Sequence, residues 1–180
     1  MKTSEVRGIV LKQYTLFEKD KCIELFSEEY GKIKLLAKYA HGSSRFGAKL
    51  EPSNNISCQV YKGRSFDTVT HCDLIMHFPN IRKTLKSISL CLYCMDIIRK
   101  ITPFHHPNSE LYDVLNSALI ALNKNPEEAS LIQKTFQDHL LLAEGLSDQT
   151  NPFHTTKNFK SIIQNYAEKP IIGLLETQGS

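Results

Sequence analysis

The spacing of apolar residues along this chain changes its period at Pro79, and this change restricts the possible folds more than any other feature of the sequence. Upstream, apolar and polar residues alternate in short runs between turn residues, which is typical of strands because successive side chains point to opposite faces. The predicted strands cover residues 6–14, 22–26, 32–39, 56–61 and 66–78. Five short strands are too few for a typical sandwich, so we expect a small closed or partly open barrel that hides its edges.

Downstream of Pro79, apolar residues recur every three or four positions, which is the spacing of one helix face. The predicted helices cover residues 81–101, 109–122, 125–145 and 159–168. The first has the widest apolar surface, so we expect it at the buried centre of this half. The sequence therefore predicts an α+β protein, with a five-stranded barrel domain over residues 1–79 and an all-α helical domain over residues 80–180.

The composition is that of an ordinary globular chain of one or two domains, with 180 residues, 41% of them hydrophobic and 23% charged. The longest uncharged apolar-leaning run, at residues 87–95, is far too short to span a bilayer. The first residues lack the apolar core of a signal peptide, and the five cysteines have no disulfide-framework spacing. We therefore expect an intracellular, cytoplasmic protein.

Positive charge gathers in the first half of the chain. Residues 1–86 hold 15 lysines and arginines against 9 acidic residues, whereas residues 87–180 hold 7 against 10. Such an imbalance suggests different partners for the two halves, although chance asymmetry is the simpler explanation.

The predicted strand over residues 32–39 carries three of these lysines on one face, and a glycine- and serine-containing loop over residues 41–49 follows it. We expect this loop to be mobile, and it carries two more cations and a phenylalanine. A cationic strand face beside such a loop suits a phosphate backbone. The alternative is an ordinary solvated face, because lysines on exposed strands also prevent edge-to-edge aggregation.

Proteins hold single-stranded nucleic acids with cations along the backbone and aromatic faces beneath the bases. On this basis the expected binding residues are Lys32, Lys34, Lys38, Arg45, Phe46, Lys49, Lys62 and Arg64. Tyr61 and Phe66 are further possible stacking residues. Tyr39 shares a predicted strand face with Ile33 and Leu35, so we expect it in the core.

Other chemistry has little support. Cys91 and Cys94 form a single pair within an apolar helical run, so they are expected to be packed core thiols and not zinc ligands. The histidine pair at 105–106 is expected in a surface loop, and no glycine-rich phosphate-binding motif is present. A small hydrolase using Cys22 or Cys58 with a histidine is the enzymatic alternative, but no motif supports it. We therefore expect no catalytic residues, no metal and no cofactor.

Several short motifs in the first 125 or so residues resemble, in order and spacing, the RecO family of bacterial recombination mediators. They are GIVL at 8–11, LFS at 25–27, YGKI at 30–33, AKYA at 37–40, SRFG at 44–47, LEP at 50–52, YKGR at 61–64, DTVT at 67–70 and FP at 78–79. The resemblance implies an OB-fold barrel followed by a helical domain, in a protein that acts without catalysis in DNA repair and recombination. It also implies binding of single- and double-stranded DNA and annealing of complementary strands.

The implied partners are RecR, the acidic and apolar C-terminal tail of single-stranded-DNA-binding protein (SSB) and, indirectly, the recombinase RecA. Many relatives carry a four-cysteine zinc module in the helical part. Here no cysteine follows Cys94 and only the linker at 147–156 stands in its place, so we expect a short form without zinc. The second hypothesis is an OB-type RNA-binding factor, which would distinguish RNA from DNA by the 2′-hydroxyl group.

Overall fold

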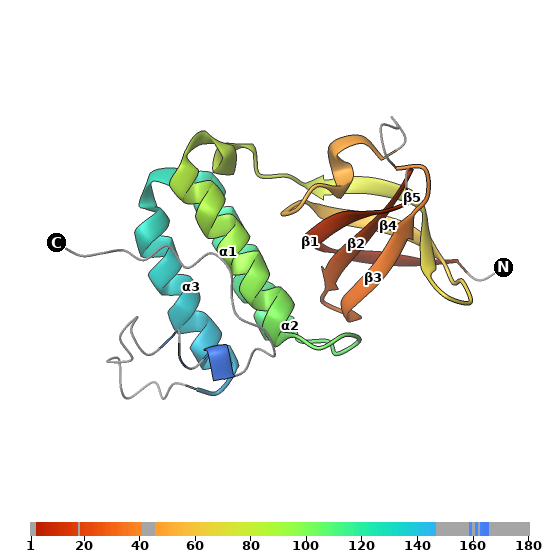
Figure 1. The fold of residues 1–180 in the computed structure, drawn as a ribbon. Helices are drawn as coiled ribbons and strands as arrows, with labels where there is room; N and C mark the ends of the chain where they lie inside the picture. Colours follow the sequence, from red (N-terminus) through yellow and green to blue (C-terminus); the bar gives the residue numbers. More distant parts are fainter. Residues whose placement is uncertain are drawn as a thin grey trace. The chain divides into compact units, whose positions relative to one another are not determined.

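The protein is described by a computed structural model over residues 3–17, 19–40 and 46–146, together with residues 159, 161 and 163–165 (Figure 1). The chain divides into two compact units. The first comprises Met1–Phe78 and Thr102–Tyr112, and the second comprises Pro79–Ile101 and the chain from Asp113 onward. The first unit thus includes a short segment from the predicted helical part, and the predicted domain boundary at residues 79 and 80 stays a prediction.

The first unit is a closed barrel of five strands in the order β1-β2-β3-β5-β4, with β4 returning to pair with β1. Its strands are β1 (Thr3–Phe17), β2 (Asp20–Ser27), β3 (Gly31–Ala37), β4 (Asn55–Tyr61) and β5 (Asp67–Met76). Four neighbouring pairs are antiparallel, whereas β3 and β5 are parallel and pair only at Leu35 with Asp67 and at Leu36 with Thr68. The predicted five-stranded barrel is therefore confirmed.

Side chains from all five strands fill the barrel, as the period-two alternation predicts. The buried residues include Val6, Val10, Ile23, Leu25, Ile33, Leu35, Ile56, Cys58, Val60, Val69 and Cys72. Strand β5 breaks the alternation at Thr70, which lies between two register pairs, Val60 with Val69 and Gln59 with His71. This β-bulge lets both Val69 and Cys72 point into the core.

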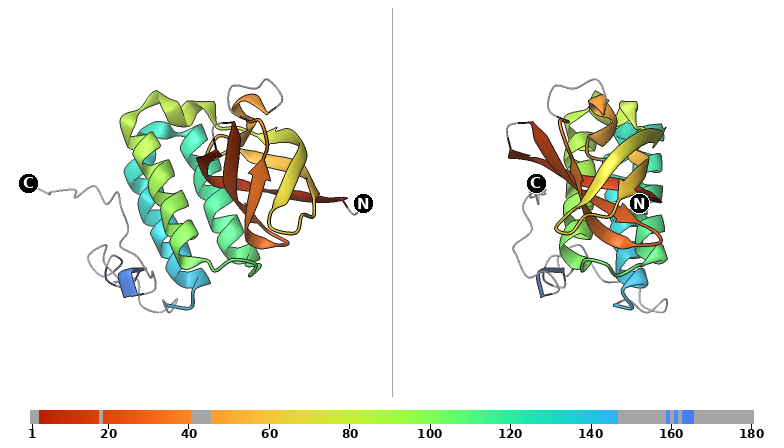
Figure 2. Two further views of the ribbon diagram at one scale, coloured as in Figure 1. Left: turned by 45° about the vertical axis from the view of Figure 1, so that its right-hand side comes forward. Right: turned by 90° about the vertical axis from the view of Figure 1, so that its right-hand side faces the viewer.

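The helical elements after the barrel are α1 (Leu85–Ile101), α2 (Ser109–Lys124) and α3 (Ala129–Ala143), with short 3-10 turns at Pro79–Lys83 and Pro126–Glu128. Within the second unit, α1, α3 and the part of α2 from Asp113 onward run side by side (Figure 2). The three predicted helices up to residue 145 are thus confirmed. The predicted fourth helix, at 159–168, lies mostly outside the described residues.

Side-chain caps begin two of these helices. The backbone N–H of Ser87 donates to Thr84 Oγ1 at 3.1 Å before α1, and that of Leu111 donates to Asn108 Oδ1 at 3.0 Å before α2. Asn125 precedes the 3-10 turn before α3, and its side chain makes no capping hydrogen bond. Thr84 and Asn108 therefore cap their helices through their side chains, and Asn125 does not.

The core of the second unit includes Cys91 and Cys94, which are buried as predicted. It also holds a polar pair, in which Gln137 Nε2 donates to the hydroxyl oxygen of Tyr93 at 2.9 Å. Desolvation raises the pKa of Tyr93 to about 12. Among the described residues, no helix is both long enough and apolar enough to cross a membrane.

Candidate nucleic-acid interface

The first half of β3 has a backbone partner that the sequence did not predict. Residues Thr102–Tyr112 belong to the barrel unit, and Phe104 forms a parallel bridge with Lys32. The backbone N–H of His105 donates to the carbonyl oxygen of Lys32 at 2.9 Å. A short segment between α1 and α2 therefore contacts the backbone of β3 before the two residues that pair with β5.

Gly31 makes this close approach possible. In the turn between β2 and β3, its φ of +67° is in the left-handed region that glycine adopts without strain. A Cβ atom at this position would also lie 2.2 Å from the carbonyl oxygen of His106. Both the turn and the docking of the 104–106 segment thus require glycine.

Phe104 brings two of the predicted binding lysines together. The Nζ atoms of Lys32 and Lys34 lie 4.4 Å and 4.8 Å from the centroid of its ring, within the range of cation–π attraction. Lys34 is exposed, whereas the ring leaves Lys32 only 6% exposed. The predicted solvent-facing row of three lysines is therefore wrong at Lys32, because a segment distant in sequence covers it.

A second group of cations lies at one end of the barrel. Leu36 and Tyr61 both pair with Thr68, so the end of β3, the end of β4 and the start of β5 meet there. We call the exposed basic and aromatic residues at this position the basic end: Lys38, Tyr39, Tyr61, Lys62, Arg64 and Phe66. The structure thus brings three of the predicted binding cations together with three exposed aromatic rings.

The expectation for Tyr39 was wrong. Its side chain is 68% exposed, because β3 ends at Ala37 and Tyr39 adopts a φ of +54° in the turn that follows. Its backbone N–H donates to Asp20 Oδ1 at 2.9 Å, which holds the turn. The strand alternation therefore does not extend to this residue, and its ring is available for stacking.

The expectation for Phe46 as an exposed stacking residue was also wrong. Its ring is 1% exposed and belongs to the barrel core. The 3-10 turn at Gly47–Leu50, with a hydrogen bond from the N–H of Lys49 to the carbonyl oxygen of Phe46, returns the chain to the barrel here. Arg45, the neighbouring predicted cation, lies outside the described residues.

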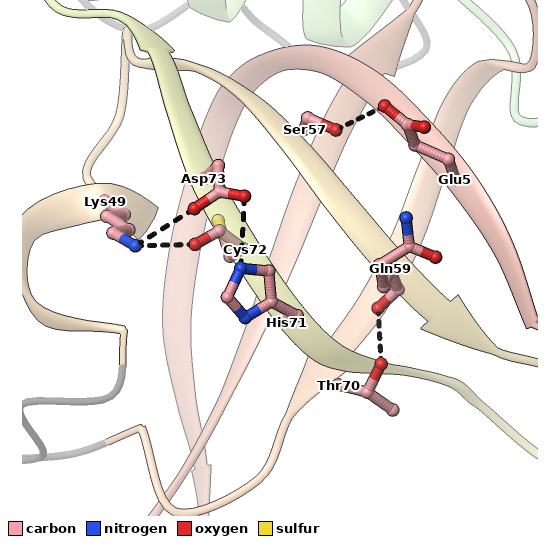
Figure 3. A network of polar contacts seen from close by, with 8 residues as sticks. All are labelled: Glu5, Lys49, Ser57, Gln59, Thr70, His71, Cys72 and Asp73. Atoms are coloured by element: carbon pink, nitrogen blue, oxygen red, sulfur yellow. Dashed lines mark hydrogen bonds and ion pairs between the residues drawn. The ribbon is translucent and has the colours of Figure 1, made fainter.

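Lys49 has structural partners on β5 (Figure 3). Its Nζ donates to the carbonyl oxygen of Cys72 at 2.7 Å and lies 3.6 Å from Asp73 Oδ1. The other carboxylate oxygen of Asp73, Oδ2, lies 3.1 Å from Nε2 of His71. The ion pair between Lys49 and Asp73 is partly exposed, so Asp73 compensates the charge of Lys49 only in part. Lys49 nevertheless fastens the 3-10 turn to β5 and is a weaker candidate for phosphate contact than the lysines of β3.

A carboxylate, that of Glu5, lies on the outer face of β1 beside β4 (Figure 3). Glu5 accepts hydrogen bonds from the hydroxyl of Ser57 at 2.8 Å and from Arg7 Nε at 2.9 Å. These two hydrogen bonds lower the pKa of Glu5, which keeps the carboxylate charged. Because Glu5 offsets the charge of Arg7, this face is a poorer candidate for phosphate contacts than β3 and the basic end.

The residue that sequence reasoning missed is Phe104. Only its position between two prolines in a loop was visible, and nothing there indicated a contact with the lysines of β3. The neighbouring histidines, His105 and His106, are exposed as predicted. In the part of the chain that the structure describes, no three His, Cys, Asp or Glu side chains are grouped so that they could hold a metal ion.

A closed five-stranded barrel with a basic and aromatic surface is of the oligonucleotide-binding (OB) class. The family model "Recombination protein O N terminal" matches residues 1–78, and "Recombination protein O C terminal" matches residues 82–145. The chain belongs to the recombination protein O family, and the predicted OB-fold and family resemblance are confirmed.

Curated relatives agree with this assignment. The DNA repair protein RecO of Acetivibrio thermocellus is 32% identical over 149 residues, which cover 81% of this chain and 57% of that protein. The protein of the same name from Geobacter metallireducens is 30% identical over 125 residues, covering 69% of this chain and 51% of the relative. The chain thus spans a little over half the length of the curated relatives it matches.

Proposed function

We propose that this chain is a DNA-binding recombination mediator in DNA repair. In this role it binds and anneals single strands and, together with RecR, helps RecA to load on SSB-coated DNA. It acts by binding and not by catalysis. The observation that carries the proposal is the basic and aromatic surface on an OB barrel, in a chain whose two halves match the two parts of one DNA repair family.

Four exposed cations are the best candidates for phosphate contacts: Lys34, Lys38, Lys62 and Arg64. Their charges neutralise phosphates of one strand and so lower the repulsion between two complementary strands. The exposed rings of Tyr39, Tyr61 and Phe66 lie at the same end of the barrel and offer faces on which bases can stack. Reversible stacking leaves bases free to exchange into a new duplex.

Salt dependence tests the phosphate contacts. Each neutralised phosphate contributes a log–log slope of about −0.7 on single strands, so replacing Lys38 and Lys62 by glutamine should flatten the slope by about 1.4 units. The matched control replaces Lys124 and Lys134, two exposed lysines of the helical elements, and should leave the slope unchanged. Equal effects of the two double variants would exclude the basic end as the binding surface.

The SSB part of the proposal rests on the first turns of α1 and the 3-10 turn before it. Leu85 is 79% exposed, and Leu92, two turns along the same helix face, is also exposed. Exposed cations surround Leu85 in sequence: Arg82, Lys83 and Lys86. An apolar face flanked by positive charge complements an acidic and apolar tail.

Annealing of two complementary oligonucleotides, naked and then coated with cognate SSB, tests both parts together. We expect the unchanged chain to accelerate both reactions. The double variant Leu85→Ser and Leu92→Ser should lose only the acceleration on coated strands, because its barrel is unaltered. If the unchanged chain accelerates neither reaction, the mediator proposal fails; if it accelerates naked strands alone, the SSB part fails.

The second candidate is an OB-type RNA-binding factor, which the same basic end would also suit. Affinities for DNA and RNA of one sequence separate the two functions, because the 2′-hydroxyl group is the main chemical difference. We expect binding to DNA to be at least as tight as binding to RNA. A clear preference for RNA together with no annealing activity would favour the RNA-binding function.

A further inference from the structure

Two cysteines of the barrel core lie directly opposite each other on neighbouring strands. Cys58 on β4 and Cys72 on β5 are register partners, and both side chains belong to the buried core of the barrel. Directly paired residues of antiparallel strands have Cα atoms about 4.5–5.5 Å apart. A disulfide spans Cα distances of about 4.4–6.8 Å, so these two thiols can be joined without a large movement of the backbone.

The surroundings of the two thiols give them different chemical roles. The hydrogen bond that joins them lowers the pKa of Cys72 and raises that of Cys58. The positive charge of Lys49 also lowers the pKa of Cys72, while desolvation acts in the opposite direction. Lys49 is held there because its Nζ donates to the carbonyl oxygen of Cys72 at 2.7 Å (Figure 3). Cys72 is therefore the thiol that ionises first, and the thiolate is the nucleophilic form.

The pair also lies at the base of the hairpin that carries most of the basic end. Between Cys58 and Cys72 the chain leaves β4, turns and returns as β5. This hairpin holds four of the six residues of the basic end: Tyr61, Lys62, Arg64 and Phe66. A bond between the two cysteines would fasten together the strands from which this turn projects.

We propose that Cys58 and Cys72 are an oxidation site of the barrel, which a peroxide converts into a disulfide that fastens the hairpin of the basic end. The Cys72 thiolate attacks one peroxide oxygen, the O–O bond breaks, and hydroxide leaves with the electron pair. The sulfur of Cys58 then attacks the resulting sulfenic acid, which forms the S–S bond and releases water that carries the Cys58 proton. This chemistry is independent of the proposed DNA-binding function, whereas its consequence for the basic end rests on that function.

Burial makes the site slow to react, and it does not by itself select this pair. Cys58 is 0% and Cys72 is 1% exposed, so peroxide reaches them only when the hairpin or the turn at Gly47–Leu50 opens locally. All five cysteines of the chain are buried. Cys91 and Cys94 are the internal control, because residues three apart on a helix have Cβ atoms about 5–6 Å apart and a disulfide needs about 3.5–4.5 Å. Desolvation also raises the pKa of Cys94.

Peptide mapping by mass spectrometry after treatment with excess hydrogen peroxide tests the site on the unchanged chain, without any nucleic acid. We expect a linkage between Cys58 and Cys72 with the loss of two hydrogens, which a reducing agent reverses. Cys22, Cys91 and Cys94 should stay reduced. A disulfide between Cys91 and Cys94 that forms as readily, or no linkage between Cys58 and Cys72, would overturn the proposal.

Two single variants separate the roles of the thiols. Cys58→Ala should leave Cys72 as a sulfenic acid, which dimedone alkylates and mass spectrometry detects. Cys72→Ala should yield neither the disulfide nor a sulfenic acid on Cys58. The reverse pattern would overturn the assignment of Cys72 as the attacking thiol. Circular dichroism checks the fold of each variant, and the mapping of the unchanged chain decides the matter if an alanine unfolds the barrel.

Hydrogen exchange and oligo-dT binding test the consequence for the basic end. Closing a loop of about 15 residues should slow amide exchange in β4 and β5 by up to roughly 100-fold, wherever exchange requires the two strands to separate. Amides of α1 should exchange at an unchanged rate. The affinity for oligo-dT should also stay unchanged, because the bond forms in the core and the side chains of the basic end are exposed.

The outcomes separate this inference from the proposed function. Equal exchange of β4 and β5 in the oxidised and reduced chains would overturn the fastening of the hairpin. A clear loss of affinity for oligo-dT on oxidation would show that the bond distorts the hairpin, which also overturns it. If neither the oxidised nor the reduced chain binds oligo-dT, the proposed function fails, while the disulfide found by mass spectrometry still supports the oxidation site.

Discussion

Replacing Gly31 by alanine should separate the 104–106 segment from β3. The residue has a φ of +67°, and an added Cβ would lie 2.2 Å from the carbonyl oxygen and 2.4 Å from the carbonyl carbon of His106. Both of these are backbone atoms, so no side chain can rotate away to relieve the collision. Either the turn between β2 and β3 or the docked segment must move.

The expected cost follows from the contacts that this movement removes. An alanine in the left-handed region costs about 1–2 kcal/mol. Loss of the hydrogen bond from His105 N–H to Lys32 O adds about 1 kcal/mol. The two cation–π contacts at Phe104 add about 0.5–1 kcal/mol each. The free energy of unfolding of the barrel unit should therefore fall by roughly 3–5 kcal/mol on these combined estimates.

Gly47→Ala is the matched control. Gly47 also has a positive φ, +49°, but among the described residues an added Cβ there would meet no atom within 4 Å apart from those of Gly47 and its two chain neighbours. Its substitution should cost only the backbone strain, about 1–2 kcal/mol. Urea unfolding followed by far-ultraviolet circular dichroism measures both variants against the unchanged chain. Equal destabilisation by the two substitutions would refute the close packing of Gly31 against His106.

Two further predictions concern buried groups. Desolvation raises the pKa of Tyr93 from 10 to about 12. The neutral phenol therefore contributes up to about 3 kcal/mol to the free energy of unfolding below pH 10, and this contribution is lost as the pH rises through 12. The free energy of unfolding should consequently fall less between pH 10 and 12 in Tyr93→Phe than in the unchanged chain. Cys58 and Cys72 are direct cross-strand neighbours with a hydrogen bond between their thiols, which raises the pKa of Cys58 and lowers that of Cys72. Diamide should oxidise this pair of thiols to a disulfide and is itself reduced to the hydrazine by the two thiol hydrogens. Mass spectrometry should detect the loss of two hydrogens from the protein. The variant Cys72→Ser should not form this disulfide.

The barrel and the first three helices were predictable because their signals are local. Alternation places Ile33 and Leu35 inside, and the turn before them needs a residue with positive φ, which Gly31 supplies. The helices follow from their apolar spacing, and the Asn108 cap follows from its side-chain chemistry. In each case a few neighbouring residues determine the structure.

Burial of aromatic residues in turns was not predictable in this way. Tyr39 and Phe46 lie at two ends of the same connection, yet the first is exposed and the second fills the barrel core. Their fates depend on where β3 ends and on how the 3-10 turn at Gly47–Leu50 returns the chain. The glycine- and serine-containing composition of this connection predicts an exposed loop. It does not indicate which of the two aromatic rings is buried in the barrel core.

The row of lysines on β3 had two explanations, DNA binding and protection of an exposed strand edge. The position of Lys32 argues against the second. Its part of the edge is already occupied by the bridge to Phe104 and the hydrogen bond from His105, so no open edge remains there for a lysine to guard. Lys34 and Lys38, by contrast, are exposed, so the binding explanation rests on these two lysines and not on Lys32.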